Sequence, residues 1–221
     1  RNHLMGGLVQ GLADTDPDLA IEFVQEVLDS GNKAAHGMVR APISAMIRTS
    51  SPLEAAQWAS QLDEGFVRDQ AMGHTADHFA RKDFEAAKEW AESVSSGDGA
   101  ERVIDPVTRN WASRDPEAAL EWVSGLPEGK AQHSGTWAAL NQWAGKDPAA
   151  ASDYLANMPD SEMRNAAISG FSNRLVWENP QAAMTWANSI TSDEMRNDVV
   201  TRVGKSWARK DPQAASDWAD R

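Results

Sequence analysis

The sequence predicts an all-α fold, a right-handed α-solenoid of antiparallel helical hairpins, because three features recur at a fixed spacing. Anchor positions follow one another every 32 residues at Pro52, Phe84, Pro116, Pro148, Pro180 and Pro212, and Pro17 lies 35 residues before Pro52. An alanine lies three residues after every anchor, and a large aromatic residue lies six residues after it. A period of this size indicates repeated supersecondary units that pack on their neighbours. We expect about fourteen helices.

The register of the anchors divides the chain into units. We expect a single repeat array over 1–221, with a half unit at 1–15, full units at 16–50, 51–82, 83–114, 115–146, 147–178 and 179–210, and a half unit at 211–221. Both ends fall within a unit, so we read the sequence as a piece of a longer protein.

A short helix is expected to open each unit. The residue before the anchor is usually Asp or Asn, which caps a helix N-terminus, and Pro is well suited to the first helical position. In the unit that begins at Asp115, apolar residues fall on one helical face at Ala119, Trp122, Val123 and Leu126. We expect Trp122 to be buried, so that Trp122→Ala costs about 3–5 kcal/mol of stability.

A longer second helix is expected to close each unit. It carries an i, i+4 apolar stripe that ends in a large residue five positions before the next anchor, as in Met195-Val199-Val203-Trp207. Gly99, Thr75 and Gly135 are the weak members of these stripes. Pro42 and Pro106 fall inside two of the helices, where each should kink the helix or restart it. The three additional residues after Pro17 are expected in the loop around Gly31.

Composition limits the classes of partner. The chain has 33 acidic and 21 basic residues and a net charge of -12, which disfavours nucleic acid and anionic membrane surfaces because binding to phosphates needs clustered Lys and Arg. A basic protein or peptide segment is an easier partner. The absence of cysteine excludes disulfides and thiolate metal sites. No apolar run is long enough to span a membrane, so we expect no membrane insertion.

The repeat resembles two groups of known sequences. The stretch from Trp207 to Trp218, WARKDPQAASDW, is similar to the crossover between helices in the tetratricopeptide class of α-solenoids, although the period is 32 rather than 34. The chain also resembles uncharacterised bacterial proteins built from the unit W-A-x-x-D-P-x-x-A-x-x-W-x-x-x-L-P. The first resemblance implies a scaffold that binds peptides or proteins in a groove.

Two candidate metal sites have simpler explanations. His74 and His78 are spaced to share a zinc ion, but no third ligand is evident, so we expect solvated side chains. The acidic stretch from Asp14 to Asp18 lacks the Gly and the distal Glu of a calcium loop and is better explained by helix capping. No motif for catalysis or for phosphate binding is present, so we expect neither enzymatic activity nor a cofactor.

One row of polar positions is the candidate for binding a partner. Seven residues before successive anchors the chemistry changes from unit to unit, and the next position varies likewise. The first row is Asp77, Arg109, Asn141, Asn173 and Lys205; the second is His78, Asn110, Gln142, Arg174 and Ser206. The first row should lie on one exposed ribbon that faces away from the short helices, and Trp137, four residues before Asn141, should project onto it as an aromatic anchor. A solvent face that drifts freely would show the same variation.

Arg68, Arg164 and Arg196 also recur at one repeat position, where an inter-repeat ion pair or a capping contact is the expected role. The function that these patterns favour is a non-catalytic scaffold that binds a protein or peptide on the longer helices. The alternatives are a structural spacer or cell-envelope scaffold without a tight ligand, and an accessory region of an enzyme whose catalytic domain lies elsewhere.

Overall fold

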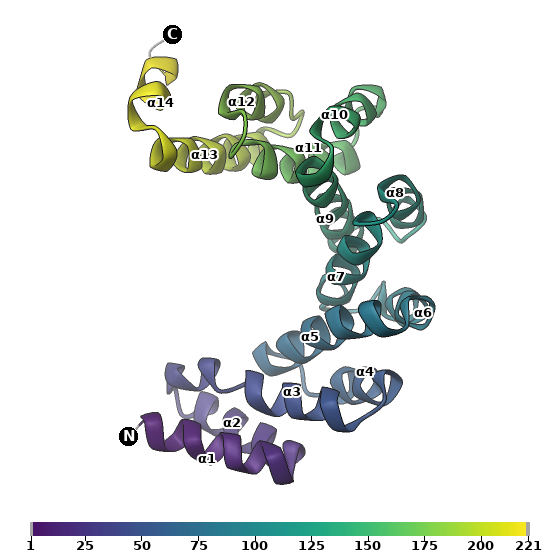
Figure 1. The fold of residues 1–221 in the computed structure, drawn as a ribbon, viewed down its shortest axis with the longest axis vertical. Helices are drawn as coiled ribbons and strands as arrows, with labels where there is room; N and C mark the ends of the chain where they lie inside the picture. Colours follow the sequence, from purple (N-terminus) through teal and green to yellow (C-terminus); the bar gives the residue numbers. More distant parts are fainter. Residues whose placement is uncertain (1, 220–221) are drawn as a thin grey trace. The chain divides into compact units, whose positions relative to one another are not determined.

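The computed structural model describes residues 2–219, with side chains from 4 to 218, and this part of the chain is entirely helical (Figure 1). It contains fourteen α-helices, one short 3-10 helix and no strand. The predicted fold class, an all-α array of helical hairpins, is therefore confirmed. Residues 1, 220 and 221 of the two predicted half units lie outside the described residues.

The helices alternate between two kinds. The short helices, which begin at or beside an anchor, are α2 (Pro17–Asp29), α4 (Pro52–Gln61), α6 (Phe84–Val94), α8 (Pro116–Ser124), α10 (Pro148–Asn157), α12 (Pro180–Asn188) and α14 (Pro212–Ala219). The long helices are α1 (Asn2–Thr15), α3 (Arg40–Thr49), α5 (Phe66–Lys82), α7 (Glu101–Ala112), α9 (Lys130–Lys146), α11 (Glu162–Leu175) and α13 (Asp193–Lys210), and the 3-10 helix η1 (Lys33–Gly37) precedes α3.

The chain forms two compact units, residues 1–107 (unit 1) and 108–221 (unit 2). In unit 1, α3 packs against both α1 and α5, and the short helices pack onto these long ones. In unit 2, α11 packs between α9 and α13, with α10 and α12 against it (Figure 1). Within each unit the long helices thus contact one another in series, and each hairpin contributes one short and one long helix.

The predicted caps are present at the N-termini of the short helices. At six of the seven, the Asp or Asn before the anchor accepts a hydrogen bond from the backbone N–H three residues later, as Asp115 does from Ala118 at 3.1 Å. Ser51 forms a complete capping box with Glu54 at the start of α4. Ser161 and Ser192 cap the long helices α11 and α13. These side chains satisfy donors of the first helical turn and fix where each helix begins.

The invariant alanine and the aromatic residue after it have different environments. The alanines are fully buried in six units, and Ala215 is half-buried. Most of the aromatic rings, including Trp122, are only half-buried, so the expectation of a buried Trp122 is wrong. Each of four rings lies beside the large residue that ends the preceding long helix, with ring centroids 5.3–6.2 Å apart in the pairs Phe79–Trp90, Trp111–Trp122, Trp143–Tyr154 and Trp207–Trp218. Because part of the Trp122 ring faces solvent, the expected cost of Trp122→Ala falls below that of a fully buried Trp.

Two expectations about the long helices need correction. Gly99 has a φ of 78° and precedes α7, so it does not belong to the apolar stripe of that helix. Pro106 lies inside the continuous helix α7, so no restart occurs at Asp105. At Pro42 the predicted interruption is present: the 3-10 helix η1 ends at Gly37, and Pro42 occupies the first turn of α3, where its missing N–H leaves no helical bond unmade.

The three additional residues after Pro17 do not simply enlarge the loop around Gly31. Helix α2 has 13 residues, whereas α4 has 10, so the insertion lengthens the short helix. Gly31, with a φ of 80°, follows the end of this longer helix.

Helices α9 and α11 of unit 2 approach each other very closely at Gly170. A methyl group placed on Gly170 would lie 2.2 Å from the backbone carbonyl oxygen of Trp137 and 3.0 Å from its Cα. The backbones are therefore in direct contact, and only glycine fits at this point of α11. Nearby, the amide Nδ2 of Asn141 donates a 3.1 Å hydrogen bond to the carbonyl oxygen of Gly170. This hydrogen bond holds Asn141, a residue of the first predicted row, against α11.

Candidate functional site on the long helices

Charge divides between the two kinds of helix. The long helices contain 16 Lys and Arg against 9 Asp and Glu, whereas the short helices contain 1 basic and 12 acidic residues. The division holds within each unit. In unit 2 the long helices α9, α11 and α13 have nine basic and four acidic residues, and the short helices have no basic and four acidic residues. The whole chain thus has a net charge of -12, whereas its long helices together have a net charge of +7.

Two titratable groups have a shifted pKa to which burial contributes most and neighbouring charges contribute less. Burial raises the pKa of the Tyr154 hydroxyl on the short helix α10, and the carboxylates of Glu117 and Glu121 on α8 raise it further. On the long helix α5, burial lowers the pKa of His78, and Lys82 and Arg81 lower it further, while Asp77 acts in the opposite direction. The neighbouring charges that act on Tyr154 are thus negative, and those that act on His78 are mainly positive.

A polar groove lies between α9 and α11 in unit 2. It has a volume of about 450 Å³ and is lined by Asn141, Gln142, Gly145, Lys146 and Arg174. A methyl group on Gly145 would lie 2.7 Å from Nε of Arg174, so the glycine leaves room for this guanidinium to lie against α9. Three of the five lining residues belong to the two predicted rows, and no acidic residue lines the groove.

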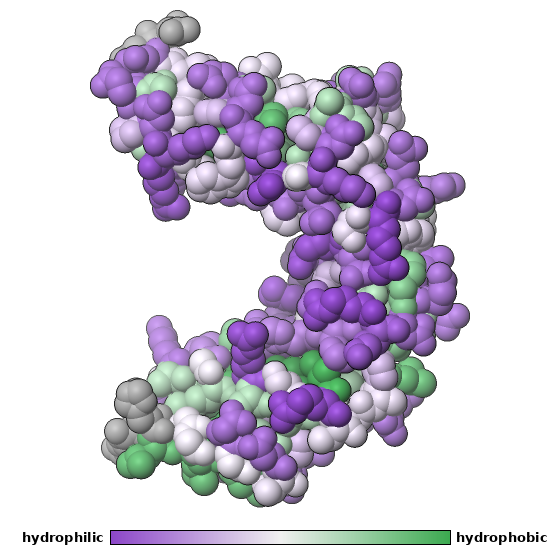
Figure 2. Space-filling model, viewed as in Figure 1, coloured by the Kyte–Doolittle hydropathy of each residue, from purple (hydrophilic) through white to green (hydrophobic). Residues whose placement is uncertain are grey.

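A narrower crevice lies between the next pair of long helices, α11 and α13. Asn173 and Ser206 from the two predicted rows line it together with Arg202. The guanidinium of Arg202 donates hydrogen bonds to Oγ of Ser169 across the crevice and to Asp198 on its own helix, both at 3.2 Å. Lys205, on the exposed side of α13, has no ion-pair partner among the described residues. Hydrophilic residues dominate the visible surface of this part of unit 2 (Figure 2).

The other members of the first row lie on α5 and α7. Asp77, on α5 in unit 1, is half-buried and forms a 2.6 Å ion pair with Arg81, and Arg109, on the unit 2 part of α7, is exposed. None of the five row residues is buried between helices. Within unit 2, Asn141, Asn173 and Lys205 lie on the successive neighbouring helices α9, α11 and α13. The single ribbon through all five remains a prediction.

The two tryptophans outside the regular pattern differ in exposure. Trp137 is half-buried, and its backbone rather than its indole makes the close contact with Gly170. Trp177, just beyond the end of α11, is 51% exposed, and its carbonyl oxygen accepts a hydrogen bond from Nζ of Lys210. Trp177 is therefore the more accessible aromatic ring. Its place outside both repeat registers was visible in the sequence, but its exposure was not.

The recurring arginines form contacts within their own repeats. Arg68 pairs with Glu64 at 3.6 Å and Arg164 with Asp160 at 3.3 Å, while Arg196 pairs with Asp193 and also donates to the carbonyl oxygen of Ile190. These residues hold the loop before each long helix. A capping contact to a backbone carbonyl is present at Arg196, and the ion pairs of all three arginines lie within a repeat rather than between repeats.

Among the residues that the structure describes, no three His, Asp or Glu side chains are grouped as potential metal ligands. His74 and His78 instead line a groove with three arginines, Arg40, Arg48 and Arg81, which is a poor environment for a divalent cation. Asp16 caps α2, as expected for the acidic stretch around it.

Comparison with known proteins gives no relative: no family model, characterised protein or solved structure matches the chain. The resemblance to tetratricopeptide-like arrays and to bacterial repeat proteins therefore stays a prediction. Among residues 2–219 there is no helix with the length and apolar character needed to cross a membrane.

Proposed function

We propose that this chain is a non-catalytic protein-interaction scaffold and that the long helices of unit 2 bind an acidic segment of a protein partner. The observation that carries the proposal is the division of charge between the helices, together with the polar groove between α9 and α11 and the crevice between α11 and α13. A stack that serves only as a spacer needs its buried alanines and aromatic residues. It does not need basic residues gathered on one kind of helix.

The chemistry of the grooves supports a peptide ligand. Gln142 and Asn173 offer amide donors and acceptors that suit a peptide backbone, and Asn141, whose Nδ2 donates to Gly170, offers its amide oxygen. Lys146, Arg174 and Arg202 offer positive charge for carboxylates, although Arg174 and Arg202 also pair with Glu178 and Asp198 and Lys146 donates to the carbonyl oxygen of Ser113. The expectation of a basic partner depends on the net charge of the whole chain. The local charge of the long helices favours an acidic partner at this surface, while the acidic short helices disfavour approach of an extended polyanion such as DNA.

Selection from a library of random dodecapeptides tests this proposal without knowledge of the natural partner. We expect the peptides retained by the whole chain to be enriched in Asp and Glu, and their binding to weaken as salt concentration rises, because exposed charges are screened. Enrichment in Lys and Arg would contradict the proposal and point to the short helices. Failure to enrich any sequence would favour the spacer, and salt-sensitive binding of duplex DNA in preference to every peptide would favour a nucleic-acid partner.

A further inference from the structure

A second groove, in unit 1, has a composition unlike the rest of this acidic chain. It lies between the long helices α3 and α5, has a volume of about 280 Å³ and is open to solvent. Its lining consists of Arg40, Ser44, Ile47 and Arg48 from α3 and His74, Asp77, His78 and Arg81 from α5. Three guanidinium groups and two imidazoles thus surround one carboxylate.

The arginines of this groove are only partly neutralised. Arg81 pairs with Asp77 at 2.6 Å, and Arg48 pairs with Asp14 of α1 at 3.4 Å. Both pairs are well exposed, so each contributes little and exchanges readily with another anion. Arg40 has no ion-pair or hydrogen-bond partner among the described residues and is exposed at the start of α3. The groove therefore keeps a positive charge that no group in unit 1 satisfies.

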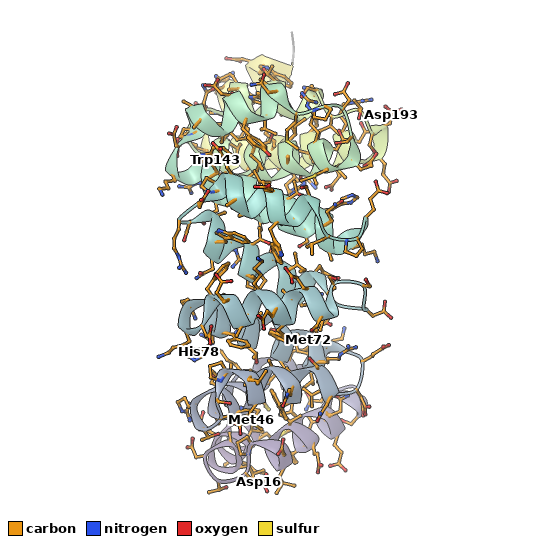
Figure 3. The ribbon with its side chains drawn as sticks, turned by 90° about the vertical axis from the view of Figure 1, so that its right-hand side faces the viewer. Asp16, Met46, Met72, His78, Trp143 and Asp193 are labelled. Carbon is orange, nitrogen blue, oxygen red and sulfur yellow. The ribbon has the colours of Figure 1, made fainter. Side chains whose placement is uncertain are left out.

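The groove is also small and is lined by hydrogen-bond donors. Its volume lies at the lower limit for ligand pockets, which fits a single charged group with its neighbouring atoms rather than a large cofactor. The hydroxyl of Ser44 and the imidazoles of His74 and His78 can donate hydrogen bonds beside the guanidinium forks, and such forks match the oxygen geometry of carboxylates and phosphates. Figure 3 shows His78 at the margin of the helices of unit 1 rather than between packed layers.

From this arrangement we propose that the groove between α3 and α5 binds an oxyanion, a carboxylate or phosphate group carried by a peptide, held by Arg40, Arg48 and Arg81. The peptide part of this inference rests on the proposed scaffold function, but the anion site lies in unit 1, apart from the unit 2 grooves on which that function is argued. The pKa of His78, which burial lowers and Lys82 and Arg81 lower further, gives the site a spectroscopic reporter.

The first experiment uses sulfate, whose charge is constant over the titration range of histidine, with chloride at equal ionic strength as the control. The pKa of His78, followed by NMR, is expected to rise when sulfate binds, because a nearby anion stabilises the imidazolium. The charged and titratable groups near His78 besides the anion are His74, Asp77, Arg81 and Lys82 on its own helix α5 and Arg40 and Arg48 on α3. Arg40→Ala should abolish the sulfate-dependent rise. Arg102→Ala, which removes one positive charge from unit 1 outside the groove, should leave it intact. An equal rise in chloride, or a rise that survives Arg40→Ala, would overturn the anion site.

The second experiment identifies the source of the oxyanion with two peptides, one with clustered glutamates and one with a phosphoserine. We expect at least one to bind the whole chain, and Arg40→Ala and Arg81→Ala each to weaken that binding by about tenfold, the scale of one charge-assisted hydrogen bond. Tighter binding of the phosphoserine peptide would assign the site to phosphate, and tighter binding of the glutamate peptide would assign it to carboxylates. If neither peptide binds, or both variants bind as the parent does, the inference fails. In that case the unit 2 long helices could still select acidic peptides. The anion site in unit 1 and the scaffold function of unit 2 can therefore fail separately.

Discussion

Gly170→Ala is expected to lower the free energy of unfolding by about 3 kcal/mol, near the top of the usual range for an overpacked site. The added methyl group would lie 2.2 Å from the carbonyl oxygen of Trp137, a backbone atom that cannot rotate away. The helices α9 and α11 would have to separate. That separation would also lengthen the hydrogen bond from Asn141 to the carbonyl oxygen of Gly170. Equilibrium urea unfolding of the whole chain measures the loss.

Gly204→Ala is the matched control for this experiment. Gly204 lies inside α13 of the same unit, where an added methyl group would meet only the end of the Met184 side chain at an ordinary 3.6 Å. This variant should be neutral, or more stable by up to about 1 kcal/mol, since alanine favours a helix interior. Similar losses in the two variants would mean that the close approach of α9 and α11 is not present in solution.

Trp207→Ala is expected to lower the free energy of unfolding by about 3–5 kcal/mol. Trp207 is only 2% exposed, the largest fully buried side chain among the described residues, and its ring lies 5.9 Å from that of Trp218. Truncation removes apolar contacts from the core of unit 2, to which Trp143 also belongs (Figure 3), and leaves a cavity that a helical hairpin cannot fill. Guanidinium unfolding, followed by circular dichroism so that the lost indole does not affect the signal, gives the value.

Trp177→Ala removes the same side chain from an exposed position. Because Trp177 is 51% exposed, this change should stay within about 0.5 kcal/mol of the parent protein. Two equal losses would show that the distinction between packing and surface tryptophans is wrong.

The sequence was sufficient for the features that are local. The cap at Asp115, the buried Ala119 and the stripe that ends at Trp207 all follow from spacing, because each is determined by residues within a few helical turns. Features that depend on contacts with a neighbouring repeat could not be predicted from the sequence. The half-burial of Trp122 depends on how its ring meets Trp111, and the backbone contact at Gly170 depends on the approach of two helices about thirty residues apart.

The effect of a proline inside a long helix could not be predicted from the sequence either. Pro42 and Pro106 occupy the same repeat position, but only the first lies in the opening turn of its helix, so sequence position alone did not distinguish a restart from a tolerated proline.

The positive charge of the candidate surface was not predicted from the sequence, although some of its residues were. The rows containing Asn141 and Arg174 were found from variation between repeats, but the positive charge around them was hidden within a net charge of -12 until the residues were assigned to long and short helices.

The central claim, that the long helices of unit 2 bind an acidic segment, is tested most directly by two variants of equal net charge. The first removes three positive charges from the long helices through Arg174→Ala, Arg202→Ala and Lys205→Ala. The second adds three negative charges to the exposed side of short helices in the same unit through Ala149→Glu, Gln181→Glu and Thr185→Glu. Both are three charges more negative than the parent, so any effect of net charge alone is the same in both.

The measurement is the calorimetric affinity of each variant for an acidic peptide selected by the parent chain. We expect the long-helix variant to bind about tenfold or more weakly, since three exposed charges together contribute roughly 1–3 kcal/mol, while the short-helix variant should stay close to the parent. Equal weakening of the two variants would mean that the peptide responds to net charge and not to a site, and greater weakening of the short-helix variant would place the binding surface on the opposite kind of helix.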